Sequence, residues 1–588
     1  MAQVKKEPFY EKTIDVFGGY NHNLRISPGE YYDGENLTSS YYPLFRTRHN
    51  RAIFTNVGMG KLQGLNSGGK LSYIKNGKIY YGGKEVSGLF FPDIEKERQF
   101  VSLGSFLLVF PDKVYLNLND LTQYGSLGAT FVTDGSVSYS LCTIDGTAYS
   151  DYIKSDTAPE DPENGDLWLD TSAISLKQYS DYSSSWETIL TTYVKISYPN
   201  IGKAFKQYDG VKISGAFDEQ FNTTMIIWAV GDDYIVVTGI IKETKTQESA
   251  LTVSREIPDM DFLCEGENRV WGCNSEKNEI YACKLGDFKN WNCFMGISTD
   301  SYAVSVGSDG EFTGAIRYLS SVLFFKENYV HKIYNTNPPY NLATSRIKGV
   351  QKGSHRSLCV VNGTLYYLSP TGICKYEGSL AFALENVFGT TYYYNAVAGE
   401  FRNKYYICMS SEANKRRLFV YDTKSGIWHK ESCLGSIIEF ACHNSNLYFI
   451  QNMIGIKILG MIDGEQPYGE FTGELRGYSE ESINNWYAET GLLGLEFSGR
   501  KYFKNVTIRF TLDETEDPQK ASYLKLYAEY DSSGTWELLD ESGAQKTHGF
   551  TIKANIPRRC DHMRLKIEGR GKCTIYSISL TVQEGSDL

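Results

Sequence analysis

One short aromatic strand recurs along the middle of the chain at an almost constant spacing. Its four copies lie at 322–325 (VLFF), 364–367 (TLYY), 404–407 (KYYI) and 446–449 (NLYF). Aligned on their third residues, successive copies are 42, 40 and 42 residues apart. A period near 40 with several strands per repeat is typical of β-propeller blades. The spacing therefore predicts a β-propeller, and it favours recognition and assembly over catalysis.

The composition also indicates an all-β protein. The 588 residues include 44 Tyr, 30 Phe and 55 Gly but only 15 Pro. Aromatic side chains favour half-buried pleated surfaces, and glycines supply the turns between many short strands. The net charge of −11 argues against a protein that grips nucleic-acid phosphates over a wide surface. It remains compatible with a surface past which nucleic acid slides.

The rhythm of the strands divides the chain into four regions. Residues 1–118 read as an N-terminal strap followed by the first blades, and residues 251–462 as the remaining blades, about six or seven in all. The Ser/Thr/Asp-rich stretch at 119–250 breaks the period, so we expect one or two small inserted β domains there. Residues 465–588 alternate with period two and predict a C-terminal β-sandwich.

Cysteine usage and the N-terminus suggest where the protein is made. The 12 cysteines are scattered, and residues 1–7 lack the apolar segment of a secretory signal. We therefore expect synthesis in a reducing cytoplasm, with mostly buried, free thiols. No apolar run reaches the roughly 18 residues needed to span a bilayer, so no membrane-spanning segment is expected.

No motif in the sequence carries a complete catalytic or metal site. Residues 64–70 (GLNSGGK) fit the start of a P-loop, but Leu71 stands where a hydroxyl must bind Mg²⁺. Four cysteines, at 264, 273, 283 and 293, are spaced too widely for paired zinc ligands and suit neighbouring strands of one blade. The eight histidines are isolated, and no nucleophile-elbow pattern accompanies them. We therefore expect no catalytic residue, cofactor or metal.

A polysaccharide-degrading propeller is a further alternative. Turns of propeller glycosidases often carry an Asp box, Ser-x-Asp-x-Gly-x-x-Trp. The polar turns before Trp186, Trp428 and Trp536 lack the required Asp and Gly spacing. With 70 acidic residues, the sequence singles out no carboxylate pair. The sequence therefore predicts that the protein is not an enzyme.

Two groups of residues remain candidates for binding. Trp168 and Trp186, in the expected insertion, could stack on sugar rings, because an aromatic face matches the apolar face of a sugar. Arg46, Arg48 and Arg51 form the densest basic cluster near the N-terminus and could contact a subunit or partner. Core packing of the tryptophans and solvation of the arginines are the plain alternatives.

Several phrases resemble propeller-type tail proteins of short-tailed bacteriophages, the hub, nozzle or packaged-DNA stabilisation proteins. Residues 18–21 (GGYN), 36–38 (NLT) and 42–48 (YPLFRTR) look like the opening of that family. Residues 281–291 (YACKLGDFKNW) resemble its blade turn, with Leu-Gly-Asp followed by Asn-Trp. Residues 156–170 are similar to a small module inserted in many phage tail proteins. Residues 550–577 resemble the C-terminal sandwich of tail proteins from phages of Gram-positive gut bacteria.

The resemblance implies a structural, non-enzymatic virion component assembled in the bacterial cytoplasm. It would be a homo-oligomeric ring, a hexamer in such tails, below the portal and adaptor. The ring would dock other tail proteins, and genomic DNA would pass through its lumen without sequence-specific binding. The acidic charge fits such a channel, because like charge reduces sticking. The insertion supports an alternative, a tail protein that binds host glycans or receptors.

Overall fold

The computed structural model describes residues 8–54, 61–149, 151–334, 340–411, 415–433, 435–453, 456–463, 479–481, 485–513, 521–543 and 550–584. Their regular elements are β-strands and three short 3-10 helices, which confirms the all-β prediction. These helices are η2 (Ile201–Ala204), η3 (Glu219–Phe221) and η4 (His355–Ser357). No helix in this described part is long and apolar enough to cross a membrane.

The chain divides into two compact units. The first consists of Met1–Glu97, Phe325–Val330 and Ser345–Leu588, and the second of Arg98–Phe324 and His331–Thr344. Each unit contains propeller sheets together with a second β domain.

Seven sheets of the described chain have the consecutive antiparallel strand order of propeller blades, which confirms the β-propeller fold class. Six have four strands, and the seventh gains a fifth. The first three blades are β7 (Leu62–Asn66), β8 (Ser72–Lys75), β9 (Lys78–Tyr81) and β10 (Lys84–Phe90); β11 (Gln99–Leu103), β12 (Phe106–Phe110), β13 (Val114–Asn117) and β14 (Tyr124–Ser126); and β28 (Phe262–Gly266), β29 (Arg269–Asn274), β30 (Glu279–Ala282) and β31 (Tyr302–Ser305).

The other blades include every copy of the aromatic repeat. They are β32 (Phe312–Tyr318), β33 (Ser321–Lys326), β34 (Tyr329–Tyr334) and β35 (Asn341–Arg346); β36 (Cys359–Val361), β37 (Thr364–Ser369), β38 (Gly372–Tyr376) and β39 (Ala381–Ala383); β40 (Tyr393–Phe401), β41 (Lys404–Ser411), β42 (Arg416–Asp422) and β43 (Ile427–Glu431); and β44 (Ser436–His443), β45 (Asn446–Met453), β46 (Ile456–Met461), β6 (Ala52–Ile53) and β47 (Ser479–Glu480).

The aromatic repeat marks the second strand of each of these four blades. The copies lie in β33, β37, β41 and β45, and their central side chains are almost completely buried. Phe324 and Phe325 are both 0 % exposed, although their side chains alternate between the two faces of the strand. Both faces are buried because blades cover one another, so the strand is apolar throughout rather than alternating.

The N-terminal segment completes the last blade. Strand β6 pairs antiparallel with β46, so the start of the chain supplies the fourth strand of the seventh sheet, and β47 pairs with β6 at the edge. Beside it, Leu65 and Tyr73 of the first blade share a hydrophobic core with Tyr448 and Ile450 of the seventh. The first and last blades therefore pack together within the first unit.

The first unit also contains a two-sheet sandwich built from both ends of the chain. One sheet has the order β4-β5-β54-β49-β52 with β1 on β54, and the other the order β2-β3-β48-β53-β50-β51. The strands are β1 (Phe9–Ile14), β2 (Gly19–Tyr20), β3 (Glu30–Glu35), β4 (Leu37–Thr38), β5 (Phe45–Thr47), β48 (Asn485–Thr490), β49 (Lys501–Leu512), β50 (Tyr523–Tyr530), β51 (Glu537–Gly543), β52 (Phe550–Cys560), β53 (Met563–Arg570) and β54 (Cys573–Glu584).

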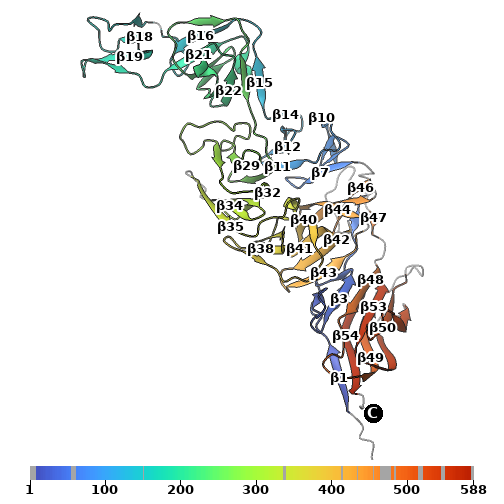
Figure 1. Ribbon diagram of the computed structural model, residues 1–588. Helices are drawn as coiled ribbons and strands as arrows, with labels where there is room; N and C mark the ends of the chain where they lie inside the picture. The colour runs from blue at the N-terminus through green and yellow to red at the C-terminus, as the bar shows by residue number, and fades with distance from the viewer. Residues whose placement is uncertain are drawn as a thin grey trace, which may run out of the picture. The chain divides into compact units, whose positions relative to one another are not determined.

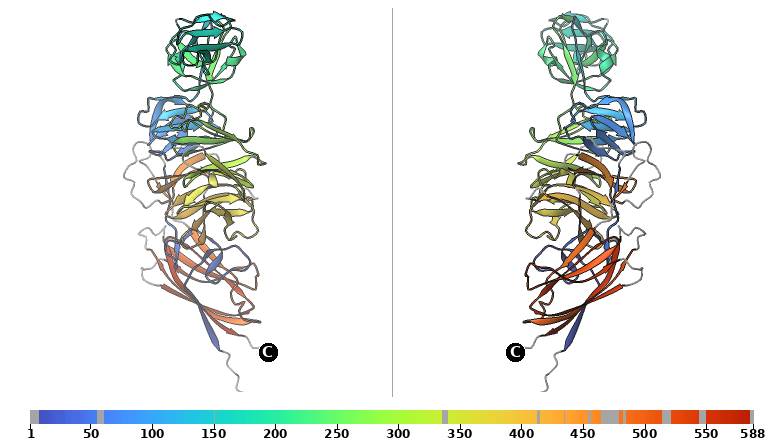
Figure 2. Two further views of the ribbon diagram at one scale, coloured as in Figure 1. Left: turned by 90° about the vertical axis from the view of Figure 1, so that its left-hand side faces the viewer. Right: turned by 90° about the vertical axis from the view of Figure 1, so that its right-hand side faces the viewer.

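The expected strap is thus part of the sandwich rather than an approach to the first blade. Figure 1 shows the blue strands β1 and β3 among the red strands β48, β53 and β54, and both views in Figure 2 show the same mixing. Period-two alternation identified the C-terminal strands, but the strap strands are too short to show that they share this sheet. The boundary expected at 465 lies outside the described residues.

The sandwich meets the sixth blade through a buried histidine. The Tyr31 hydroxyl of β3 lies 2.6 Å from Nδ1 of His429 in β43, whereas Nε2 of His429 is buried without a hydrogen-bond partner. Burial, helped by the charge of Lys404, lowers the pKa of His429 to about 3. The folded protein therefore keeps this imidazole neutral at pH values where an exposed histidine is protonated.

Acidification should therefore weaken the fold. In the unfolded chain His429 is protonated near pH 6.5, whereas in the folded chain it stays neutral down to about pH 3. The free energy of unfolding falls as the pH drops between these values, by about 2 kcal/mol at about pH 5. The His429→Asn variant retains an oxygen acceptor and removes the titration, so its stability should depend less on pH. Urea denaturation at about pH 7 and pH 5 measures this, and an unchanged pH dependence would contradict it.

The second unit carries the inserted domain between its blades. The insertion's strands run from Ala129 to Arg255, so residues 119–126, expected to be inserted, instead complete the second blade. They are β15 (Ala129–Val132), β16 (Val137–Cys142), β17 (Ile153–Ser155), β18 (Leu167–Asp170), β19 (Ser175–Ser180), β20 (Ser185–Thr188), β21 (Tyr193–Ser197), β22 (Gly210–Ser214), β23 (Thr224–Ile226), β24 (Ala229–Gly231), β25 (Tyr234–Thr238), β26 (Lys245–Gln247) and β27 (Thr252–Arg255).

The blade turn at 281–291 holds the insertion in place. The Asn290 side chain donates to the Tyr208 carbonyl at 2.7 Å and accepts from the Gly210 amide at 3.2 Å. In the same turn, Asp287 pairs with Lys206 at 2.7 Å. A side-chain amide that both donates and accepts fixes one orientation of the two backbones. The Leu-Gly-Asp and Asn-Trp phrase therefore has a structural role in this chain.

Candidate functional site

The two candidate tryptophans lie in a small four-stranded module of the insertion. Strand β17 runs parallel to β18, and β18, β19 and β20 form an antiparallel meander. Figure 1 shows β18 and β19 beside β16, β21 and β22, which belong to the larger part of the insertion. The turn before β18 depends on Gly165, whose φ of +96° lies in the left-handed region that favours glycine.

Strand register divides the module into two faces. Leu169 lies opposite Leu176, and both join the buried core of the insertion. Residues alternate along a strand, and cross-strand partners share a face. Trp168, Tyr179 and Trp186 therefore lie on the opposite face from this leucine pair, with Tyr179 directly across from Trp186.

Trp168 lies in the interior of the module. Its side chain is 5 % exposed, and its indole Nε1 donates to the Ser155 carbonyl at 3.2 Å. The Lys177 ammonium lies 4.4 Å from its ring centroid and 2.9 Å from Asp170 Oδ2. Hydrogen bonds from the Ala173 amide and Ser172 hold the pKa of Asp170 well below its usual range, so this ion pair persists. The ring is not free to stack on a sugar, which corrects the expectation for Trp168.

Trp186 is the more accessible of the pair. It is half-buried, and its ring meets those of Trp168 and Tyr179 edge-on, each with 5.5 Å between centroids. Tyr179 is also half-buried, and Tyr182, in the turn between β19 and β20, is fully exposed. We name Tyr179, Tyr182 and Trp186 the aromatic surface. Sequence reasoning missed both tyrosines, although the alternation of Tyr179 with Lys177 pointed to a shared face.

The loop before β18 supports the aromatic surface from one side. The Gly165 amide donates to the Tyr179 carbonyl, and the Tyr179 amide donates to the Asp166 carbonyl, both at 2.9 Å. Asn164 Oδ1 accepts from the Asp181 amide at 3.0 Å, next to Tyr182. The backbone of the hairpin is therefore fixed beside two of its aromatic side chains. Such preorganisation reduces the entropy lost on binding a ligand.

Two of the three candidate arginines are buried in ion pairs within the chain. Arg48 bonds Glu481 through two nitrogens, at 2.9 and 3.1 Å, and Arg51 lies 2.6 Å from Glu431. The side chains of Arg48 and Arg51 are only 4 % and 3 % exposed. This corrects the expectation of partner contact: Arg51 joins the strap to the sixth blade, and Arg48 joins it to Glu481, directly after β47 of the seventh blade. The reason is that a buried guanidinium needs carboxylate partners, and the fold supplies them.

Arg46 has a different environment from its two neighbours. Its guanidinium lies 4.0 Å from the ring centroid of Tyr41, which is exposed, and the arginine itself is half-buried. It is the member of the cluster that stays available at the surface, so its contact with a subunit or partner remains a prediction.

A polar cleft of about 730 Å³ lies in the second unit near the base of the insertion. Tyr281 donates to Glu279 Oε2 at 2.5 Å, and Lys113 pairs with Asp259 at 2.7 Å. The hydrogen bond and charge of Lys113 lower the pKa of the Asp259 carboxyl, whereas burial raises the pKa of the Tyr281 phenol. At neutral pH Asp259 is thus no proton donor, and Tyr281 is no phenolate nucleophile.

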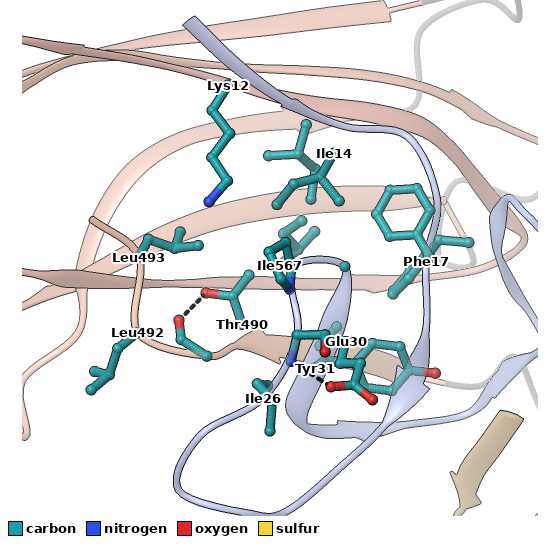
Figure 3. Close-up of a pocket in the computed structure, with 17 residues that line it drawn as sticks. Lys12, Ile14, Phe17, Ile26, Glu30, Tyr31, Thr490, Leu492, Leu493 and Ile567 are labelled. Atoms are coloured by element: carbon teal, nitrogen blue, oxygen red, sulfur yellow. Dashed lines mark hydrogen bonds between the residues drawn. The ribbon is translucent and has the colours of Figure 1, made fainter. Parts of the chain in front are cut away.

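An apolar cavity of about 60 Å³ lies within the sandwich. Figure 3 shows Ile14 and Phe17 of the strap with Leu493 and Ile567 around it. Its charged neighbours are engaged elsewhere: Lys12 pairs with Glu496 at 3.0 Å, and Glu30 accepts from the Ser27 amide at 2.6 Å. The cavity lies between strap residues and C-terminal residues of the sandwich and offers no converging set of polar groups.

The predicted cysteine series belongs to the third blade. Cys264 lies on β28 and Cys273 on β29, whereas Cys283 follows β30 directly and Cys293 lies in the loop before β31. Burial raises the pKa of the Cys264 and Cys283 thiols, which keeps them protonated. Within the described residues, no group of three or more His, Cys, Asp or Glu side chains is arranged to hold a metal ion.

Comparisons with known proteins identify similar structures at low similarity. Neither a family model nor a curated protein matches the sequence. The phage phi92 endosialidase is 9 % identical, covers 75 % of this chain and 74 % of its own, and has a TM-score of 0.24. BamB from Moraxella catarrhalis is 10 % identical over 35 % of this chain and 70 % of its own, with a TM-score of 0.21. A GH43 glycoside hydrolase is 8 % identical over 54 % and 95 %, with a TM-score of 0.21.

These structures correct one prediction and leave another open. The prediction that the protein is not an enzyme is contradicted, because glycoside hydrolases and an endosialidase are among the similar folds. The lack of a linear motif cannot exclude an enzyme, because catalytic carboxylates assemble in space and need not leave such a motif. At these TM-scores the likeness assigns no activity to this chain. One neighbour is a phage protein, and none named here is a tail hub or nozzle.

Proposed function

We propose that this protein is a bacteriophage tail component that binds carbohydrate of the host surface through the inserted domain. The aromatic surface carries the proposal, because Tyr179, Tyr182 and Trp186 lie on one hairpin whose backbone is fixed. Aromatic rings pack against the apolar faces of sugars, and their hydroxyl and indole groups bond sugar hydroxyls. The tail assignment rests on the sequence resemblances at 42–48 and 281–291.

Different residues of the module form its interior and its exposed aromatic surface. Trp168 and the Lys177–Asp170 pair form the interior, so Trp186 can present part of its ring without unfolding the sheet. The leucine face attaches the module to the rest of the insertion. A propeller body and a sandwich would then position this hairpin at the virion tail.

The ring-forming hub or nozzle remains the more specific role implied by the resemblance. In that role the same chain would form a homo-oligomer, sixfold by analogy with such tails, and would contact portal, adaptor and DNA. Mass photometry of the purified full chain tests this directly. A stable closed ring supports the hub role, whereas a persistent monomer at all concentrations counts against it.

Glycan binding by the full chain is the central test. On a panel of bacterial surface glycans we expect a distinct set of positive sugars, with affinity reduced about 2–10-fold by Tyr182→Ala because one exposed ring is lost. Tyr576→Ala removes another exposed tyrosine, on β54 of the sandwich, and should leave binding unchanged. If the unmodified chain binds no glycan, or both variants lose binding equally, the proposed function fails.

A further inference from the structure

A further pocket, of about 150 Å³, lies in the first unit between the fifth and sixth blades of the propeller. Ile373 of β38, Phe388 and Met409 of β41 line it and are buried, so its floor is apolar. Glu385 and Tyr392 also line it and are exposed, so they form its rim. A cavity of this order of volume accommodates one benzene-sized group. The pocket therefore suits a single compact group rather than an extended oligosaccharide.

Three aromatic side chains line this pocket in fixed positions. Phe388 and Tyr393 meet edge-on, with 5.5 Å between their ring centroids and an interplanar angle of 65°. Gln351 holds both tyrosines, because its Nε2 donates to the Tyr392 hydroxyl at 2.7 Å and to the Tyr393 carbonyl at 3.1 Å. We name Phe388, Tyr392 and Tyr393 the aromatic pocket. Rings set at an angle around a small space can present their electron-rich faces to one bound cation.

The charge of the lining also favours a cation. Within the described part of the chain, Glu385 is the one charged side chain that lines the pocket, and no described residue pairs with it. The nearby Arg417 lies opposite Met409 in the strand register, is exposed, and its charge reaches Tyr393. It does not line the pocket. Aromatic faces beside an unpaired carboxylate attract positive charge, and Arg417 weakens that attraction from outside.

The neutral polar groups of the lining are already engaged within the chain. Ser369 Oγ donates to the Gly372 carbonyl at 2.7 Å. Asn386 accepts from the Phe388 amide at 3.0 Å and donates to the Gly389 carbonyl at 2.9 Å. A primary ammonium is strongly hydrated and brings three N–H donors, so entry would leave donors without acceptors. A quaternary ammonium has no N–H group to leave unsatisfied, and it therefore fits this pocket better.

We propose that the aromatic pocket binds a quaternary ammonium group of the choline type. The methyl groups pack against Phe388, Tyr392 and Tyr393, and Glu385 supplies the opposite charge at the rim. The pocket shares no residue with the aromatic surface of the insertion. This inference therefore goes beyond the proposed carbohydrate binding and does not depend on it.

Choline and its uncharged isostere 3,3-dimethylbutanol, in which carbon replaces the nitrogen, test the inference with the full chain. Ligand-observed NMR titration and calorimetry should give saturable choline binding, at least about fivefold tighter than that of the alcohol. Butylammonium, a primary ammonium, should bind more weakly than choline because of its hydration. Equal affinity for choline and the alcohol, or tighter binding of butylammonium, overturns the proposal.

Matched variants locate the site. Tyr392→Ala removes an exposed ring and should weaken choline binding at least about fivefold, whereas Tyr392→Phe keeps the ring and most of the affinity. Glu385→Gln should weaken choline binding severalfold and leave binding of the alcohol unchanged. Glu11→Gln removes an exposed carboxylate on β1 of the sandwich and should change neither. Choline binding that survives both Tyr392→Ala and Glu385→Gln overturns the assignment to this pocket.

Arg417→Gln should change choline binding in the opposite direction. Removing this nearby cation should tighten binding, most clearly at a low salt concentration of about 20 mM. Weaker choline binding in this variant overturns the proposal, because Arg417 would then hold an anion rather than repel a cation.

Two further comparisons identify the source of the group and separate this inference from the proposed function. Co-flotation of the chain with phosphatidylcholine vesicles indicates a lipid headgroup, whereas binding of choline and phosphocholine without flotation indicates a soluble or polymer-borne group. If choline does not bind saturably, this inference fails while glycan binding by the aromatic surface stands. If choline binds and no glycan of the panel does, the proposed function fails alone.

Discussion

Replacing Trp186 by alanine is expected to abolish most glycan binding by the full chain while leaving its fold intact. Trp186 is half-buried and supplies the largest ring of the aromatic surface. Loss of such a ring commonly weakens binding at least about tenfold. Calorimetry with the tightest glycan of the panel measures the loss, and circular dichroism verifies the fold. Trp186→Phe keeps an aromatic face and should retain much of the affinity.

Trp168→Ala, at the tryptophan that packs against Trp186, should instead destabilise the module. Its 5 % exposed side chain fills the interior of the module, so truncation should cost about 3–5 kcal/mol and loosen the module. Limited proteolysis should then cut residues 151–190 in the Trp168→Ala protein and spare them in the Trp186→Ala protein. If Trp186→Ala also exposes the module to protease, its effect on binding would be structural and the assignment of the aromatic surface would be wrong.

The contrast between these tryptophans shows what sequence could and could not supply. Both follow polar turns, but Trp168 lies between two leucines and Trp186 between Ser185 and Glu187. Such patterns identify strands without identifying the covered face. The deciding contacts are Ser155 on Trp168 and the Lys177–Asp170 pair. Charge and amphipathic stems permit lysine either to face water or to cover a ring. Only the folded module decides between these arrangements.

The propeller was predictable because its signal is local and repeated. The strands at 322–325, 364–367, 404–407 and 446–449 are buried on both faces, so each repeats the same apolar run. The strand that the N-terminal segment adds to the last blade was not predictable in this way. Strand β6 has two residues and pairs with β46, some 400 residues later in the chain. A pairing that short leaves no period in the sequence, and its register depends on the folded sheet.

Arg51, expected from the sequence to contact a partner, is buried against Glu431 within its own chain, so its removal should strongly destabilise the fold. Arg51→Ala is expected to reduce the free energy of unfolding by about 3–5 kcal/mol, because Glu431 would remain buried with an incomplete set of partners. The Arg51 side chain is 3 % exposed and also donates to the Ser432 carbonyl at 2.8 Å. Urea denaturation of the full chain measures the change.

Two companion variants determine whether the cost comes from the buried charge. Arg46→Ala removes a half-buried arginine that stacks on Tyr41 and should cost no more than about 1 kcal/mol. Arg51→Met combined with Glu431→Met removes both charges and should recover part of the stability lost in Arg51→Ala, since no unpaired ion remains. Should Arg51→Ala leave stability unchanged but alter the oligomeric state, the partner contact expected from sequence would be the correct role. The structure argues for the first result, because Arg51 reaches its carboxylate within its own chain at 2.6 Å and is shielded from any other molecule.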